Sequence, residues 1–249
     1  MSVFKNVLII TDNIHLSKKV EEIINDKNFK ESKITFSISP FSSIDLFQKS
    51  LKRKIYCYDL KKEKDLNFIQ KTFDLVISIQ CKQFFPKKLI QSVKCINVHP
   101  GYNPINRGWY PQVFSILHDL PIGATIHEMD DQLDHGNIIV RELIEKTQLD
   151  TSLSLYNKVI QKEIELFEDT ISCIVSNNYK TVPPESGGNL FLKKDFKELL
   201  ELDLSEKTTV GEVLKRLRAL SHGDFKNAYY FDSETKKKIY ISIVIEEEK

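Results

Sequence analysis

Short apolar runs alternate with amphipathic segments along most of the chain. Residues 7–10 and most of 73–79 are apolar, which is typical of strands buried on both faces of a parallel sheet. Leu16, Val20 and Ile24 recur at helical spacing between these runs. The same criteria predict further strands at 34–38, 55–58, 95–99 and 138–140, and helices at 46–51, 89–93 and 110–118. This alternation predicts βαβ units on a mostly parallel sheet.

The second half of the chain contains a change of pattern. Residues 153–174 keep an apolar stripe that predicts one long helix, and residues 183–188 then form the strongest loop signal in the chain. We therefore place a domain boundary at residue 180. The predicted fold class is α/β, with residues 1–180 forming a Rossmann-like, mostly parallel sheet that carries helices on both faces. Residues 181–249 predict a small α+β appendage, with a helix at 210–220 and a β-hairpin whose strands are 228–231 and 239–245.

Composition and charge narrow the class of protein. The 249 residues carry 36 Lys+Arg and 35 Asp+Glu, a formal net charge of +1, which gives no sign of nucleic acid or an anionic membrane as a partner. Cys57, Cys81, Cys95 and Cys173 lack C-x-x-C spacing, so we expect reduced thiols in the core. No signal-peptide pattern precedes the first strand, and no apolar run approaches the roughly 20 residues that cross a bilayer. We expect a soluble, cytoplasmic protein.

Three polar side chains suggest chemistry. Asn97 and His99 occupy alternate positions at the end of the predicted strand 95–99, so both side chains turn to the same face. Asp134 lies in a turn just before the strand 138–140. An amide donor beside an imidazole suits a reaction in which a carbonyl oxygen gains negative charge while a proton moves. A carboxylate such as Asp134 supplies the missing third group.

Three sequence blocks carry a resemblance to a known family. They are residues 97–101 (NVHPG), 123–127 (GATIH) and 134–136 (DHG), and in this order they resemble formyltransferases that use 10-formyltetrahydrofolate. The resemblance implies that Asn97, His99 and Asp134 are the catalytic residues and that 10-formyltetrahydrofolate is the co-substrate. Asn97 and His99 would stabilise an oxyanion. Asp134 would orient or charge-balance His99 and accept the amine proton, directly or through water.

The neighbouring histidines leave a metal site as an alternative. His127 and His135 lie close to the three residues in the motif, and with Asp134 they could in principle hold zinc. They lack the H-x-x-x-H or C-x-x-C spacing of zinc sites, so we expect no metal.

The family resemblance also implies a folate pocket. Two loops would line it, one after the fourth main strand and one leading to the catalytic carboxylate. The implied cofactor-binding residues are Phe84, Phe85, Met129, Asp130 and Asp131. The two phenylalanines replace aliphatic residues that are common in the family, and ordinary core packing is an equal alternative for them.

The loop after the catalytic strand resembles the nucleotide-sugar branch of the family. Its sequence contains Gly-Tyr-Asn-Pro and Arg-Gly-Trp, and the segment 225–231 (FKNAYYF) resembles an Asn-Ala-Tyr-Phe segment of the same branch. The implied substrate-binding residues are Lys82, Tyr102, Asn103, Arg107, Trp109, Tyr229 and Tyr230. The expected reaction is formylation of a nucleotide-linked amino sugar, specifically dTDP-4-amino-4,6-dideoxyglucose, for surface-polysaccharide (O-antigen) synthesis.

Other functions stay open at this point. Within the same chemistry, methionyl-tRNA and glycinamide ribonucleotide are alternative acceptors. A protein that binds folate or a sugar nucleotide without catalysis is an alternative of another class, and a broken catalytic trio would have favoured it.

The terminal strand predicts a homodimer. Ile239, Ile241 and Ile243 form one apolar row, and Tyr240 and Val244 belong to the other. A two-stranded ribbon is marginally stable alone, so each face needs a cover. The first domain can cover one face, and a second copy of the hairpin, residues 228–245, can cover the other. The alternative is that the helix of the appendage covers the second face.

Overall fold

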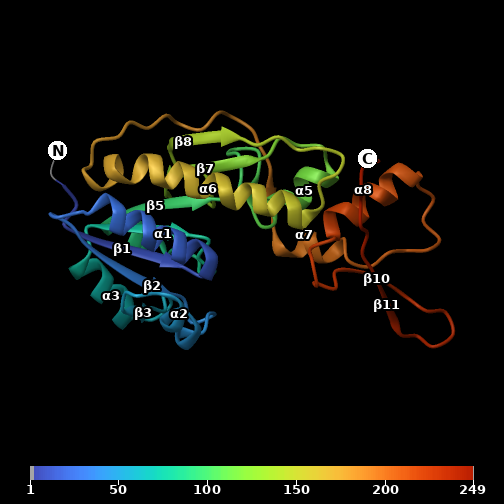
Figure 1. The fold of residues 1–249 in the computed structure, drawn as a ribbon, viewed down its shortest axis with the longest axis horizontal. Coiled ribbons are helices and arrows are strands. Elements are labelled where there is room, and N and C mark those ends of the chain that lie inside the picture. The colour runs from blue at the N-terminus through green and yellow to red at the C-terminus, as the bar shows by residue number, and fades with distance from the viewer. Residues whose placement is uncertain (1–2, 249) are drawn as a thin grey trace.

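A seven-stranded sheet organises the computed structural model, which describes residues 3–248 (Figure 1). The strand order is β3-β2-β1-β4-β5-β7-β8. Pairing is parallel from β3 to β5 and antiparallel from β5 to β7 and from β7 to β8. The strands are β1 (Asn6–Thr11), β2 (Lys33–Ile38), β3 (Ile55–Cys57), β4 (Leu75–Ile79), β5 (Lys94–His99), β7 (Gly123–Glu128) and β8 (Ile138–Leu143). The expectation of a mostly parallel α/β sheet is confirmed.

Helices cover both faces of this sheet, as expected. Val7 and Ile9 of β1 pack in one cluster with the helices α1 and α6, whereas Leu8 and Ile10 pack in a second cluster with α3 and α4. Because side chains alternate across a strand, a strand buried on both faces must be apolar at every position. The helices are α1 (Ile14–Lys27), α2 (Ile44–Ser50), α3 (Glu63–Thr72), α4 (Lys87–Ser92), α5 (Pro111–Leu117) and α6 (Ser152–Val175).

The segment after α6 returns along the first domain. Val182 forms a bridge with Ile138 of β8, and the two-residue strand β9 (Leu190–Phe191) pairs with β6 (Arg107–Gly108). In Figure 1 this stretch runs from the far end of α6 along β8 to α7 (Lys193–Glu198). The boundary at residue 180 stays a prediction, and the chain directly beyond it still pairs with the first domain at Val182 and at Leu190–Phe191.

The appendage contains the predicted helix and hairpin. They are α8 (Val210–Leu220), β10 (Ala228–Phe231) and β11 (Lys238–Ile241). A third apolar cluster joins them to the first domain through Val113 of α5, Leu155 of α6 and Leu217 of α8. The predicted strand 239–245 is too long. It ends at Ile241 because β10 offers only four residues for pairing.

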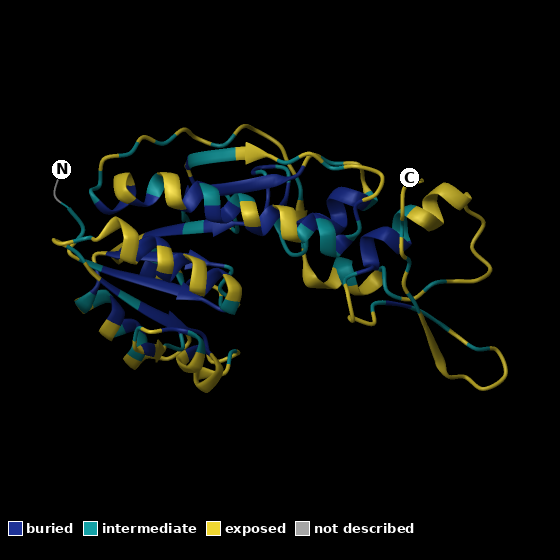
Figure 2. Ribbon diagram, in the orientation of Figure 1, coloured by how far each residue is buried: buried dark blue, intermediate teal, exposed yellow. Residues whose placement is uncertain are grey.

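The two rows of the terminal strand differ in exposure. Ile241 and Ile243 are half-buried against the third cluster, which includes α8. Ile239, Tyr240 and Val244 are 38%, 44% and 87% exposed, and β11 with the turn before it is coloured mostly exposed in Figure 2. The appendage therefore covers Ile241 and Ile243 itself and leaves Ile239, Tyr240 and Val244 to solvent in this chain.

Two expectations about the surface can be compared with the structure. Cys57 and Cys173 are exposed, so the expectation that all four thiols lie in the core is wrong for these two. Cys173 lies on the exposed face of α6, and Cys57 ends β3, the edge strand of the sheet. Across residues 3–248, no helix combines the length and apolarity that crossing a membrane requires.

Candidate active site

Strand pairing brings the three predicted catalytic residues together. Asn97 and His99 end β5, and Asp134 comes from the loop between β7 and β8. Asn97 Nδ2 donates to Asp134 Oδ1 over 3.0 Å, and His99 Nδ1 lies 3.6 Å from Asp134 Oδ2. Both oxygens of the carboxylate therefore face a group from β5.

The imidazole of His99 has a defined hydrogen-bonding pattern. His99 is buried, and its Nε2 lies 2.8 Å from the carbonyl oxygen of Asn106. A carbonyl only accepts, so Nε2 must carry the proton. Burial lowers the pKa of His99, although the charge of Asp134 opposes this shift. The resting ring is thus neutral, and Nδ1 presents a lone pair beside the carboxylate.

Gly101 makes this arrangement sterically possible. A Cβ at this position would lie 2.5 Å from His99 Nε2 and 2.7 Å from the Asn106 carbonyl oxygen. Any larger residue would push His99 away from the Asn106 carbonyl oxygen and break the hydrogen bond that keeps the proton on Nε2. The Pro-Gly pair after the catalytic strand is therefore required by packing as well as by the turn.

His127 supports the same carboxylate from β7. Its Nδ1 lies 2.7 Å from the Glu128 carbonyl oxygen, so Nδ1 donates and Nε2 is left as an acceptor. His127 Nε2 lies 3.4 Å from Asn97 Nδ2 and 3.8 Å from Asp134 Oδ1. His127 therefore helps to orient the amide that holds the carboxylate.

Asp134 is buried and remains ionised. Burial alone would raise the pKa of Asp134, but the neighbouring imidazoles of His99 and His127 and the N–H of Gly108 outweigh burial and hold this pKa well below its usual range. Gly108 donates its N–H to Asp134 Oδ2 over 2.9 Å. An ionised carboxylate next to a neutral imidazole can stabilise that ring when it takes up a proton.

A cavity of about 730 Å³ opens beside these residues. Its wall includes the trio, His127, four of the predicted folate residues and two of the predicted substrate residues. Those six are Phe84, Phe85, Met129, Asp130, Lys82 and Trp109. Phe85 is only 6% exposed and packs in the second core cluster, whereas Phe84 is 69% exposed.

The remaining predicted binding residues lie outside the cavity wall. Asp131 is an exposed partner of Lys87, and Arg107 and Tyr102 belong to the loop behind the wall. Asn103 is buried beneath the site, where its Nδ2 donates to the Asp134 carbonyl oxygen. Tyr229 and Tyr230 lie on β10. None of these six residues lines the cavity within one chain, and Asn103 instead supports the backbone of Asp134.

The cavity wall also contains residues that the sequence analysis missed. They come from the end of β4, α5, α6 and the appendage, and they are Gln80, Gln112, Ser152, Tyr156, Phe196, His222, Phe225 and Asn227. His222 Nδ1 lies 3.0 Å from Ser152 Oγ, and Gln112 Nε2 donates to the same hydroxyl over 3.4 Å. The sequence carried a signal for Phe225 and Asn227, which belong to the FKNAYYF segment. No local motif marks the other six positions.

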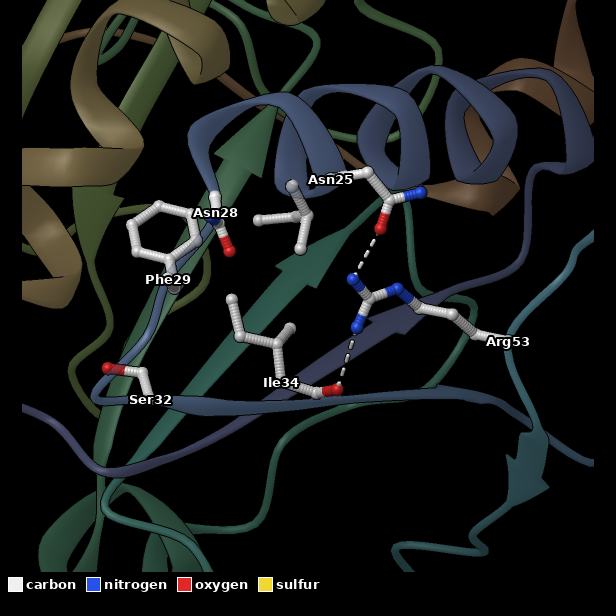
Figure 3. Close-up of a pocket in the computed structure, with 7 residues that line it drawn as sticks. Asn25, Asn28, Phe29, Ser32, Ile34 and Arg53 are labelled. Carbon is white, nitrogen blue, oxygen red and sulfur yellow. Dashed lines mark hydrogen bonds between the residues drawn. The ribbon is translucent and has the colours of Figure 1, made fainter.

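One smaller recess shares no lining residue with this cavity. It has a volume of about 170 Å³ and lies between α1 and β2. Figure 3 shows Arg53 donating to Asn25 Oδ1 and to the Ile34 carbonyl oxygen across it. These bonds fasten the loop before β3 to the body of the domain, and we assign the recess no catalytic role. Over residues 3–248, no group of three or more His, Cys, Asp or Glu side chains is placed to hold a metal ion.

Comparison with known proteins assigns the family. Residues 14–171 match the family model described as formyl transferase, and residues 195–247 match the N-formyltransferase dimerization C-terminal domain. The chain belongs to the formyl transferase family. The expectation of a formyltransferase is therefore confirmed, and Asn97, His99 and Asp134 lie within the matched residues 14–171.

Relatives of this formyltransferase cover nearly all of its length. A dTDP-4-amino-4,6-dideoxyglucose formyltransferase from Mycobacterium bovis is 48% identical over 73% of this chain and 77% of its own. The structure of a 4-N formyltransferase from Francisella tularensis is 39% identical, with a TM-score of 0.91 over 98% of each chain. A sugar N-formyltransferase from a Shewanella species is 37% identical, with a TM-score of 0.92 over 98% of this chain and 99% of its own.

Proposed function

We propose that this enzyme transfers the formyl group of 10-formyltetrahydrofolate to the amine of dTDP-4-amino-4,6-dideoxyglucose, for surface-polysaccharide synthesis. The observation that carries the proposal is the intact Asn97, His99 and Asp134 constellation on the wall of a cavity of about 730 Å³. Pockets of this size accommodate cofactor-sized ligands. The 48% identity to an enzyme named for this sugar supports the choice of acceptor.

The cavity wall divides into two groups of residues by their origin in the chain. The β4–α4 loop and the β7–β8 loop contribute Phe84, Met129 and Gln132. We assign this group to the folate, whose ring system can pack on apolar side chains such as Phe84 and Met129. The second group, from α5, the start of α6 and the appendage, includes Trp109 and His222, and we assign it to the nucleotide-linked sugar.

The proposed mechanism follows from the resting hydrogen bonds. The sugar amine attacks the formyl carbon, a new C–N bond forms, and the carbonyl oxygen becomes an oxyanion. The Asn97 amide stabilises this charge, and the imidazole contributes once its Nδ1 carries a proton. His99 Nδ1 takes the amine proton, because Nε2 already carries one and Asp134 stabilises the resulting imidazolium. The oxyanion then collapses and breaks the bond between the formyl carbon and the folate nitrogen, while the His99 imidazolium returns its proton to that nitrogen. The products are the formylated amine and tetrahydrofolate, and His99 is neutral again.

The assembly we propose is a homodimer through the appendage. Residues 195–247 match a dimerization domain, and exposed apolar side chains gather on α8 and the hairpin. They are Val210, Val213, Leu214, Phe231, Ile239, Tyr240 and Val244. A two-fold pairing of this surface would bury the row of β11 that one chain leaves exposed. We place the enzyme in the cytoplasm, which agrees with four unpaired cysteines.

A substrate panel tests the proposed reaction. The enzyme is incubated with 10-formyltetrahydrofolate and, separately, with 4-amino and 3-amino dTDP-sugars, a UDP-amino sugar, methionyl-tRNA and glycinamide ribonucleotide. We expect the mass of one formyl group to appear on dTDP-4-amino-4,6-dideoxyglucose with the highest kcat/KM. Preferred formylation of any other acceptor would overturn the substrate assignment, and binding without turnover would overturn catalysis.

A further inference from the structure

The backbone of the loop beside Asp134 is held by a segment far away in sequence. Gly108, which donates its N–H to Asp134 Oδ2 over 2.9 Å, lies on the two-residue strand β6. β6 pairs in parallel with β9, Leu190–Phe191. The hydrogen bonds continue at both ends, because Arg107 N donates to the Asn189 carbonyl oxygen and Trp109 N donates to the Phe191 carbonyl oxygen. We call residues 188–191 the strap.

Glycines on each side of this pairing allow the two backbones to approach closely. Gly108 has a φ of +94°, and a Cβ there would lie 2.1 Å from the Phe191 carbonyl oxygen. Gly188 has a φ of +92°, and its Cβ would lie 2.1 Å from the Pro104 carbonyl oxygen. That same carbonyl oxygen accepts a bond from Asn189 N over 3.2 Å. Both contacts need a residue without a Cβ.

The ring of Phe191 anchors the strap to the first domain. It stacks on Phe114 of α5, with ring centroids 4.0 Å apart and an interplanar angle of 4°. It also stacks on His118, with ring centroids 5.6 Å apart. Phe191 does not line the cavity wall. Any effect of Phe191 on a ligand in the cavity must therefore be indirect.

We propose that the strap is a positioning element of the active site, which holds Gly108 so that its N–H fixes the carboxylate of Asp134 beside His99. The catalytic part of this inference rests on the proposed function. Asp134 is faced by Asn97 and His99 from β5 and by His127 from β7. Of these four groups, Gly108 is the one whose strand pairs with the segment that follows α6. The linker between the two family domains thus contributes to the geometry of catalysis.

Two neighbouring glycines provide a matched pair of variants. Gly187 and Gly188 have φ values of +97° and +92°, so Ala at either position carries the same backbone strain. A Cβ at Gly187 meets nothing within 4 Å, whereas one at Gly188 meets the Pro104 carbonyl oxygen. We expect Gly188→Ala to lower kcat by about 10²-fold relative to Gly187→Ala, since small displacements of a catalytic group cost about this much. The KM for the folate should be the same in both.

Nuclear magnetic resonance supplies a readout that does not depend on turnover. In Gly188→Ala the ¹⁵N resonances of the His99 ring should shift, because Asp134 moves relative to Nδ1, while Gly187→Ala should match the parent. If the parent shows no formyl transfer, the proposed function fails and these resonances still test the strap. Equal kcat and equal His99 resonances in the two variants would overturn the inference.

A second pair of variants covers the case in which Gly188→Ala does not fold. Phe191→Ala removes the stacked ring but leaves the backbone unchanged, and Phe191→Tyr keeps the ring. We expect Phe191→Ala to reproduce the loss of kcat and the change in His99 resonances, and Phe191→Tyr to restore both. Parent-like values in folded Phe191→Ala would also overturn the inference.

Discussion

Gln80 donates its side-chain amide to the buried carboxyl group of Glu163 over 2.6 Å, which joins the cavity wall to α6. Gln80 Oε1 in turn accepts from Asn13 Nδ2 and from the hydroxyl of Tyr156. Glu163 is 1% exposed, and burial raises its pKa to about 8, against the opposing effect of the Gln80 bond. The folded protein therefore keeps a carboxyl proton at neutral pH.

Stability should therefore fall as pH rises. The folded state keeps the Glu163 proton, whereas the unfolded chain releases it above its ordinary pKa of 4.5. The contribution of Glu163 to the free energy of unfolding therefore decreases as the pH rises from about 4.5 to about 8. At about 1.4 kcal/mol per pKa unit, the change is a few kcal/mol. Urea unfolding at several pH values measures it. Glu163→Gln should flatten the dependence, whereas Glu168→Gln, at an exposed residue on the same helix, should not.

Activity should depend on a neutral His99. Burial lowers the pKa of His99 below its ordinary value of 6.5, and the protonated ring cannot accept the amine proton. kcat/KM should therefore be constant near neutral pH and decline only below about pH 6.5. A pH profile of the parent tests this, with His15→Gln as a control on an exposed histidine of α1. An acid limb centred above pH 7 would contradict the assigned proton acceptor.

Removing any member of the trio should abolish most turnover. Asn97→Ala, His99→Ala and Asp134→Ala each lose an oxyanion or proton-transfer group, and each should lower kcat by about 10²-fold or more. Circular dichroism would verify that the fold survives. Asp131→Ala is the matched control, because this exposed carboxylate pairs only with Lys87 at the surface. A folded Asp134→Ala variant with parental kcat would show that Asp134 has no role in the reaction.

Replacing Trp109 should weaken binding of the nucleotide-sugar and leave binding of the folate almost unchanged. Trp109 lines the cavity, and Lys193 Nζ lies 3.7 Å from its ring centroid. Trp109→Ala should weaken binding of the nucleotide-sugar about tenfold through lost stacking area, and should leave folate binding almost unchanged. Separate calorimetric titrations of the two ligands measure this, with Trp109→Phe as the variant that keeps a ring. Equal weakening of both ligands would assign Trp109 to folding instead.

The oligomeric state should depend on the exposed row of β11. Light scattering of the parent at micromolar concentration should give the mass of a dimer, and Tyr240→Lys with Val244→Lys should give a monomer. Ile44→Lys is the control, since Ile44 is a similarly exposed apolar residue on α2. Ile241 and Ile243 are unsuitable for this test because they pack within their own chain. A monomeric parent would contradict the proposed assembly.

The sequence predicted the sheet and the trio because both depend on local patterns. A strand buried on two faces must be apolar throughout, as β1 is, and the alternation around Asn97 and His99 sets the direction of their side chains. The element boundaries differ by one or two residues in most cases. The end of β11 differs more, since it depends on the length of its partner β10.

The rest of the site could not be predicted because it depends on long-range pairing. Gly108 reaches Asp134 through a hydrogen bond between residues 26 positions apart, and Gln80 reaches Glu163 across 83 positions. Neither residue lies in a motif with a known spacing. His222 enters the cavity wall only because the third apolar cluster docks α8 against α5 and α6.

The helix α6 makes the two parts of the chain thermodynamically inseparable. Its 24 residues span about 36 Å. Its first turns, with Leu155 and Val159, belong to the third apolar cluster, while Ile164 and Phe167 pack on the sheet. Melting either cluster would leave half of this helix without a partner, so heat should unfold residues 3–248 in one cooperative transition. Any contact that stabilises the projecting hairpin therefore raises the melting temperature of the catalytic sheet as well.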